Sequence, residues 1–127
     1  MKKRILFIED DAATLDVYGT ALKEAGFKVE IITLGEEAIK RVKEMKDAEK
    51  PDLVLLDLIL PDINGIEVLK EIRKRKEMEA LPVFILTNYT DEQLEKEGIR
   101  LDSEKYLPKT DYPPNRLVEL VKERLKK

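Results

Sequence analysis

The sequence predicts an α/β domain in which a five-stranded parallel sheet is doubly wound, with helices on both of its faces. Short apolar runs recur along the chain, and longer amphipathic stretches of helical spacing lie between them. The two patterns alternate five times, each strand coming before its helix. Because crossovers between parallel strands are right-handed, this alternation covers both faces of one open sheet.

Five apolar runs mark the expected strands. The runs are nearly continuous rather than alternating, which is typical of parallel strands that are covered on both faces. The fifth run is the weakest, and the five cover residues 5–8, 29–32, 53–56, 83–86 and 106–107.

Apolar residues at helical spacing mark the segments between the runs. In the first segment, Leu15, Tyr18, Leu22 and Ala25 share one face, and Gly26 ends the helix. The segment before the fifth run carries few apolar residues, so we expect it to be held weakly against the sheet. The other four expected helices lie near residues 38–45, 66–76, 91–98 and 113–125.

The composition limits the possible chemistry. The 127 residues suit a single domain, residues 1–127, and include no Cys and no His, which excludes a thiolate nucleophile and a histidine base. Charged residues make up 40% of the chain, and the net charge of −3 argues against direct contact with nucleic acid. The N-terminal apolar run is too short for a signal peptide or a membrane span, so we expect a cytoplasmic protein without membrane contact.

Polar residues follow four of the five runs, where each expected strand ends. In a parallel sheet these ends meet at one edge, where ligands bind. Each residue alone has an ordinary explanation as a helix cap, which we favour for Asp11, a solvated acid, a hydroxyl bonded to backbone or a surface cation. The set consists of Glu9, Asp10 and Asp11 after the first run, Asp57 after the third, Thr87 after the fourth and Lys109 after the fifth.

Asp57 is the hardest of these residues to explain by structure alone, because apolar residues flank it on both sides. Carboxylates that gather at one edge attract a divalent cation, and oxygen-only ligands favour Mg²⁺. A carboxylate is also a nucleophile toward phosphorus and forms an aspartyl phosphate. Lys109 and Thr87 would then neutralise and hydrogen-bond the phosphoryl oxygens.

The sequence resembles a response-regulator receiver domain of the chemotaxis-regulator-like superfamily over essentially its whole length. The resemblance implies a flavodoxin-like sheet of strand order 2-1-3-4-5 and a role in two-component signalling. It is carried by "ILFIEDD", "PDLVLLDLILPDINGIEVL", "LPVFILTNYTDE" and "KYLPKTD". The second segment is the most specific, and it matches D-x-x-[LM]-P-x-x-[DN]-G at Asp57, Leu60, Pro61, Asn64 and Gly65.

The resemblance also implies a role for each matching residue. Asp57 is the phosphoacceptor, and the phosphodonor is a phosphohistidine on a sensor histidine kinase or a histidine phosphotransfer protein. Mg²⁺ is held by Glu9, Asp10, Asp57 and the backbone carbonyl of Ile59. Lys109 contacts the phosphoryl group, while Thr87 and Tyr106 form a coupled switch that alters the surface for a downstream protein partner.

We therefore expect a signalling switch that catalyses only its own phosphorylation and dephosphorylation and has no metabolic substrate. We expect a monomer or weak homodimer with no output domain within the sequence, and whether the chain stands alone or belongs to a larger protein stays open. A haloacid-dehalogenase-type phosphatase would need a second Asp where Ile59 lies, and the intact acids, Thr87 and Lys109 argue against a degenerate receiver. Nucleotide-binding glycine motifs are absent.

The sequence departs from the family pattern at Asp102-Ser103 before the fifth run, at Asn88 after Thr87, and at Thr110 after Lys109. We nevertheless expect a cis Lys109–Thr110 peptide, as the resemblance implies. In the resembling family, two positions flank the path of the hydrolytic water, and Ile59 and Tyr89 occupy them here. Since both are bulky, we expect slow self-dephosphorylation.

Overall fold

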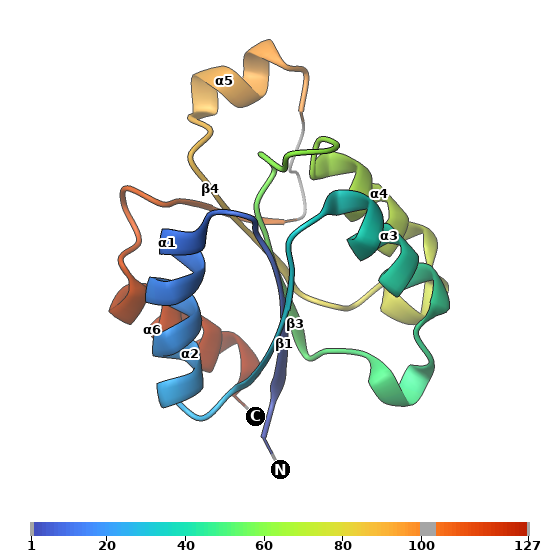
Figure 1. Cartoon of the computed structure of the whole chain (residues 1–127), viewed down its shortest axis with the longest axis vertical. Coiled ribbons are helices and arrows are strands. Elements are labelled where there is room, and N and C mark those ends of the chain that lie inside the picture. Colours follow the sequence, from blue (N-terminus) through green and yellow to red (C-terminus); the bar gives the residue numbers. More distant parts are fainter. Residues whose placement is uncertain (1, 100–103, 127) are drawn as a thin grey trace.

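Five parallel strands form one sheet in the order β2-β1-β3-β4-β5, which confirms the predicted topology (Figure 1). The structure is a computed structural model and describes residues 2–99 and 104–126, so Asp102-Ser103 lie outside the described residues. Each strand contains one of the predicted apolar runs. The strands are β1 (Arg4–Ile8), β2 (Lys28–Ile32), β3 (Leu53–Leu56), β4 (Val83–Thr87) and β5 (Lys105–Pro108).

The predicted helices are present, and the first one contains an unpredicted wide turn. It runs without a break through α1 (Ala12–Thr14), a π-helical turn (Leu15–Gly19) and α2 (Thr20–Glu24). The Asp11 side chain caps this helix by accepting from Thr14 N, as expected, and Gly26 with φ of 100° follows its end. The remaining helices are α3 (Gly35–Glu44), α4 (Ile66–Lys74), α5 (Asp91–Lys96) and α6 (Pro114–Leu125), with 3₁₀ turns at Asp47–Glu49 and Lys76–Met78.

Side chains of each strand alternate between two hydrophobic clusters, one on each face of the sheet. From β1, Ile5 and Phe7 pack with residues of the π turn, α2 and α6, while Leu6 and Ile8 pack with residues of α3 and α4. Figure 1 shows these two groups of helices on opposite sides of the sheet, with α5 at one end. The fold is therefore doubly wound, as the alternation of apolar runs with helical stretches predicted.

Candidate functional site

Asp57 lies directly after β3, and its carboxylate is held at the end of the sheet. Its backbone N–H donates to the carbonyl of Ile8, and only 4% of the residue is exposed. One carboxylate oxygen, Oδ1, accepts from Ile59 N at 3.1 Å, and Oδ2 lies 3.2 Å from Lys109 Nζ. Gly65 packs so closely that an added Cβ would clash with the Asp57 carbonyl. The backbone and the side chain of Asp57 are thus both fixed.

Glu9 places a second carboxylate beside the first, directly after β1. The residue is fully buried, and its Oε2 accepts from Asp11 N at 3.1 Å. Oε1 forms an ion pair with Lys109 Nζ at 2.8 Å but accepts no hydrogen bond of good geometry. Burial, and then the charge of Asp57, raise the pKa of Glu9 to about 7. Two buried carboxylates with one incompletely satisfied oxygen favour additional positive charge at this position.

Lys109 joins the two acids from the loop after β5. Its backbone N–H donates to the Thr87 carbonyl at 2.9 Å, which fixes the loop against β4. Burial works to lower the pKa of the Lys109 ammonium, but its close contacts with Glu9 and Asp57 and the negative charges of both acids outweigh it, so the pKa is raised. The predicted cis Lys109–Thr110 peptide is wrong, since the described residues contain no cis bond. With a trans peptide the ammonium already reaches both carboxylates.

Thr87 and Tyr106 are linked through the backbone of Tyr89. The Thr87 side chain is fully buried at the end of β4, and its hydroxyl accepts a long hydrogen bond of 3.4 Å from Tyr89 N. Tyr106 on β5 is half-buried, and its hydroxyl donates to the carbonyl of the same Tyr89. Movement of the loop after β4 would therefore affect both side chains.

Two of the predicted metal ligands lie at the surface. Asp10 is exposed, and Ile59, whose backbone carbonyl is the other predicted ligand, is a 44% exposed residue in the loop after Asp57. Among residues 2–99 and 104–126, no three His, Cys, Asp or Glu side chains are gathered closely enough to form a metal site on their own. The buried Glu9 Oε1 and the adjacent Asp57 nevertheless fit a hard cation, because they supply charged oxygens in a poorly solvated place.

The sequence pattern did not reveal two contacts that shape the surroundings. The Asp62 carboxylate, in the loop after Asp57, accepts from the backbone N–H groups of Gly35 and Glu36 at the start of α3. It therefore ties that loop to a helix 26 and 27 residues away in sequence. An Asp near a turn was visible in the sequence, but its distant partner was not.

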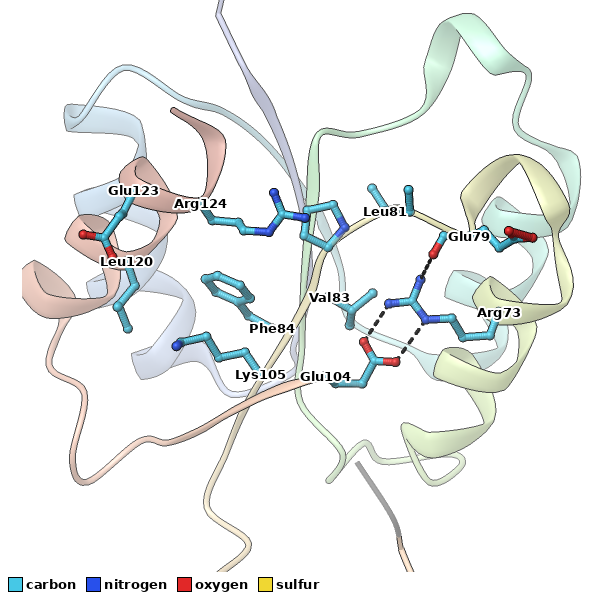
Figure 2. Close-up of a pocket in the computed structure, with 12 residues that line it drawn as sticks. Arg73, Glu79, Leu81, Val83, Phe84, Glu104, Lys105, Leu120, Glu123 and Arg124 are labelled. Carbon is cyan, nitrogen blue, oxygen red and sulfur yellow. Dashed lines mark hydrogen bonds and ion pairs between the residues drawn. The ribbon is translucent and has the colours of Figure 1, made fainter. Parts of the chain in front are cut away.

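A hollow of about 530 Å³ lies where β4 and β5 begin, at the other end of these strands from Thr87 and Lys109 (Figure 2). Val83, Phe84 and Leu120 supply part of its apolar lining. Arg73 crosses it to Glu104, which lies just before β5, and forms two hydrogen bonds of 3.0 and 2.6 Å. The lining of this hollow shares no residue with the acidic site. The ion pair between Arg73 and Glu104 is the second contact that the sequence pattern did not reveal.

A parallel sheet of this strand order, with buried acids and a lysine at the carboxyl edge where such folds bind ligands, defines the flavodoxin-like class of doubly wound folds. A sequence model described as the response regulator receiver domain matches residues 5–122. The chain belongs to the response regulator receiver domain family, which acts in two-component signalling and not in metabolism. This confirms the resemblance seen in the sequence.

Named relatives support the assignment. The alkaline phosphatase synthesis transcriptional regulatory protein PhoP of Bacillus subtilis is 36% identical over 114 residues, which cover 89% of this chain and 45% of PhoP. The DNA-binding response regulator MtrA of Mycobacterium tuberculosis is 35% identical over 127 residues, covering 100% of this chain and 52% of MtrA. The chain thus spans about half the length of these relatives.

A solved structure shows the same fold. The receiver domain of sensor histidine kinase PA1611 from Pseudomonas aeruginosa PAO1 superposes with a TM-score of 0.82 at 20% identity, and the match covers 100% of both chains. That structure is described with a magnesium ion coordinated in its active-site cleft.

Among the helices in the described part of this chain, none has the length and apolar composition needed to cross a membrane.

Proposed function

We propose that this domain is a phosphorylation-controlled switch in which Asp57 accepts a phosphoryl group from a phosphohistidine of a sensor kinase or a histidine phosphotransfer protein. The observation that carries this proposal is the buried Asp57 carboxylate with Lys109 Nζ at 3.2 Å and Glu9 alongside. Pairing with an ammonium orients one oxygen of the carboxylate, and membership of the receiver family supports the assignment.

The transfer follows from the groups present. An Asp57 carboxylate oxygen attacks phosphorus, the P–N bond of the phosphohistidine breaks, and its electron pair returns to the imidazole, which leaves as neutral histidine once protonated. Lys109 offsets the negative charge that develops on the phosphoryl oxygens, and the Thr87 hydroxyl donates a hydrogen bond to one of them. The products are an aspartyl phosphate on this domain and an unphosphorylated histidine side chain on the donor protein.

Glu9, Asp10, Asp57 and the Ile59 carbonyl would hold Mg²⁺ at this site, with waters completing its coordination. When bound, the ion supplies charge neutralisation of the phosphoryl oxygens. The magnesium described in the PA1611 receiver domain supports this part of the proposal. Glu9 contributes a carboxylate that is already oriented by Asp11 N, whereas the exposed Asp10 must be ordered on binding.

Phosphorylation draws the Thr87 hydroxyl toward the phosphoryl group in this proposal. The Tyr89 N–H then loses its partner on Thr87, the loop after β4 moves, and Tyr106 follows through its bond to the Tyr89 carbonyl. The changed surface, formed by α5 and β5, is the signal to a downstream protein. We infer that the domain itself contacts proteins rather than nucleic acid, because its net charge is −3. We also propose that it acts in the cytoplasm as a monomer or weak homodimer.

Intact-mass spectrometry after incubation with acetyl phosphate and Mg²⁺ tests the phosphoacceptor. We expect one added phosphate on the parent protein, none on Asp57→Asn, and normal addition to Asp47→Asn, which changes an exposed acid in a distant 3₁₀ turn. Equal phosphorylation of the Asp57→Asn protein would show that the assignment is wrong.

Asp10→Asn should weaken Mg²⁺ binding, and an unchanged affinity would place the ion elsewhere.

A further inference from the structure

The first helix touches the loop that carries Lys109 at two points. The Tyr18 hydroxyl donates a 2.7 Å hydrogen bond to the Tyr112 carbonyl and lies 3.4 Å from the Lys109 carbonyl. Four residues earlier, Thr14 Oγ1 accepts from Lys109 Nζ at 3.4 Å. One helix therefore contacts the backbone of this loop and also the ammonium group that reaches Glu9 and Asp57.

Tyr18 lies within the π-helical turn, Leu15–Gly19. Single π turns inside α-helices are rare and occur frequently at functional sites. The Tyr18 residue is only 7% exposed and packs in the hydrophobic cluster that includes Leu107 and Leu117, on either side of the Lys109 loop. Burial raises the pKa of the Tyr18 hydroxyl, so it stays protonated and remains a donor at neutral pH.

The loop between β5 and α6 is held partly by its own backbone hydrogen bonds, and Tyr18 adds a restraint on its carbonyl groups. No proline ring restricts the backbone at Lys109, Thr110 or Asp111. The Asp111 N–H donates to the Pro108 carbonyl and closes a turn, and the Lys109 N–H is held by Thr87. The carbonyl groups of Lys109 and Tyr112 then both face the single hydroxyl of Tyr18.

We propose that Tyr18 is a positioning residue for Lys109, whose hydroxyl fixes the turn over residues 109–112 so that the ammonium lies between Glu9 and Asp57. The inference rests on the proposed function, in which Lys109 neutralises the transferred phosphoryl group. Tyr18 does not touch the reacting atoms. It acts through the backbone of the residue that does.

Tyr18→Phe removes the hydroxyl and keeps the buried ring. We expect phosphorylation by acetyl phosphate with Mg²⁺ to slow roughly three- to tenfold, the effect of losing one hydrogen bond. Binding of beryllium trifluoride, which mimics a phosphoryl group, should weaken to the same degree, while Mg²⁺ affinity stays within about twofold. The matched control is Tyr112→Phe, which loses a hydroxyl from the same loop but keeps the carbonyl that accepts from Tyr18, and it should retain the parental rate.

A double-mutant cycle distinguishes positioning of Lys109 from a general loss of structure. In a Lys109→Ala background, or Lys109→Gln if the first fails to fold, Tyr18→Phe should have no further effect. If Tyr18→Phe is phosphorylated at the parental rate, or if it still slows phosphorylation in the Lys109 variants, the inference about Tyr18 is wrong. The proposed role of Lys109 would then still stand. Parental phosphorylation of the Lys109 variants themselves overturns the proposed role of Lys109, and with it this inference.

Discussion

Ile59 shows how one side chain sets the surroundings of the proposed phosphoacceptor. Its backbone N–H donates to Asp57 Oδ1, which places the residue next to the carboxylate, while the residue is 44% exposed and its side chain is apolar. Tyr89, the other bulky residue expected to flank the water path, is half-buried and hydrogen-bonds Thr87 through its N–H. Neither position offers a carboxylate or amide group to orient a water molecule.

The aspartyl phosphate should consequently be long-lived, because hydrolysis requires a water aligned opposite the bond that breaks. We expect Ile59→Asn to speed phosphate release by about three- to tenfold, since an amide can orient that water. The measurement is the rate of phosphate release from the purified phosphoprotein. Leu34→Asn, a similar change at another exposed apolar residue, is the control and should leave the rate unchanged. If the Ile59→Asn phosphoprotein releases phosphate no faster than the parent, the bulky side chain does not shield the aspartyl phosphate from water.

At the scale of the elements, an ion pair joins α4 to the start of β5. Arg73 donates two hydrogen bonds to Glu104, whose side chain is 5% exposed, and another to the Glu79 carbonyl (Figure 2). It also donates to the Met78 carbonyl. These contacts bring together a helix and the edge strand of the sheet. The apolar runs could not predict them, because the partners are 31 residues apart.

We expect Arg73→Ala to lower the free energy of unfolding by about 2–3 kcal/mol, because it removes two charge-assisted hydrogen bonds from a poorly exposed carboxylate. Lys70→Ala, which removes an exposed pair with Glu67 on the same helix, should cost less than about 0.5 kcal/mol. Urea unfolding of both variants provides the comparison. Equal losses would mean that the Arg73 pair behaves as an ordinary surface contact.

The helix α5 is the element best suited to move. Leu94 is its one buried residue, and the Thr90–Gln93 capping box stabilises it locally rather than against the sheet. We expect amide hydrogen exchange to change in residues 87–99 and 104–108 when beryllium trifluoride and Mg²⁺ bind. Exchange in α3 should stay the same beyond its first turn. Unchanged exchange throughout residues 87–108 would count against the proposed switch.

At the scale of the whole molecule, the pattern of apolar runs was sufficient for the sheet, the two helical layers and the edge where Asp57 and Lys109 meet. Strand ends are local features of sequence, and the parallel topology brings them together. The π turn, the Tyr18 contact with Tyr112 and the reach of Asp62 to α3 depend on partners distant in sequence, so no local pattern specified them. The expected cis peptide was taken from resemblance, and this loop achieves the same reach with a trans bond.

Global stability should depend on pH through Glu9. Its pKa is raised to about 7 by burial and by Asp57, so its contribution to stability is complete below about pH 4.5 and is lost as the pH rises through 7. Lys109 has a raised pKa and titrates above this range. The metal-free protein should therefore be less stable at pH 8.5 than at pH 6, by an amount on the order of 1–1.5 kcal/mol.

Thermal unfolding in the presence of a chelator measures this difference. Glu9→Gln should reduce it strongly, since the amide does not ionise, and Glu24→Gln, at an exposed helical position, should preserve it. Mg²⁺ should raise the melting temperature most at pH 8.5, where the Glu9 carboxylate is charged. A metal-free parent protein with the same stability at both pH values would refute the interpretation of Glu9.

The close approach of Gly65 to the Asp57 backbone has a consequence for which sequences can carry this site. Any Cβ at position 65 would meet the Asp57 carbonyl and Leu58 Cα, so the chain would have to shift at the phosphoacceptor itself. Gly19, in contrast, has no atom within 4 Å of an added Cβ. In a saturation mutagenesis experiment, position 65 should therefore be as intolerant as position 57 although it carries no reactive group, whereas alanine at position 19 should survive selection.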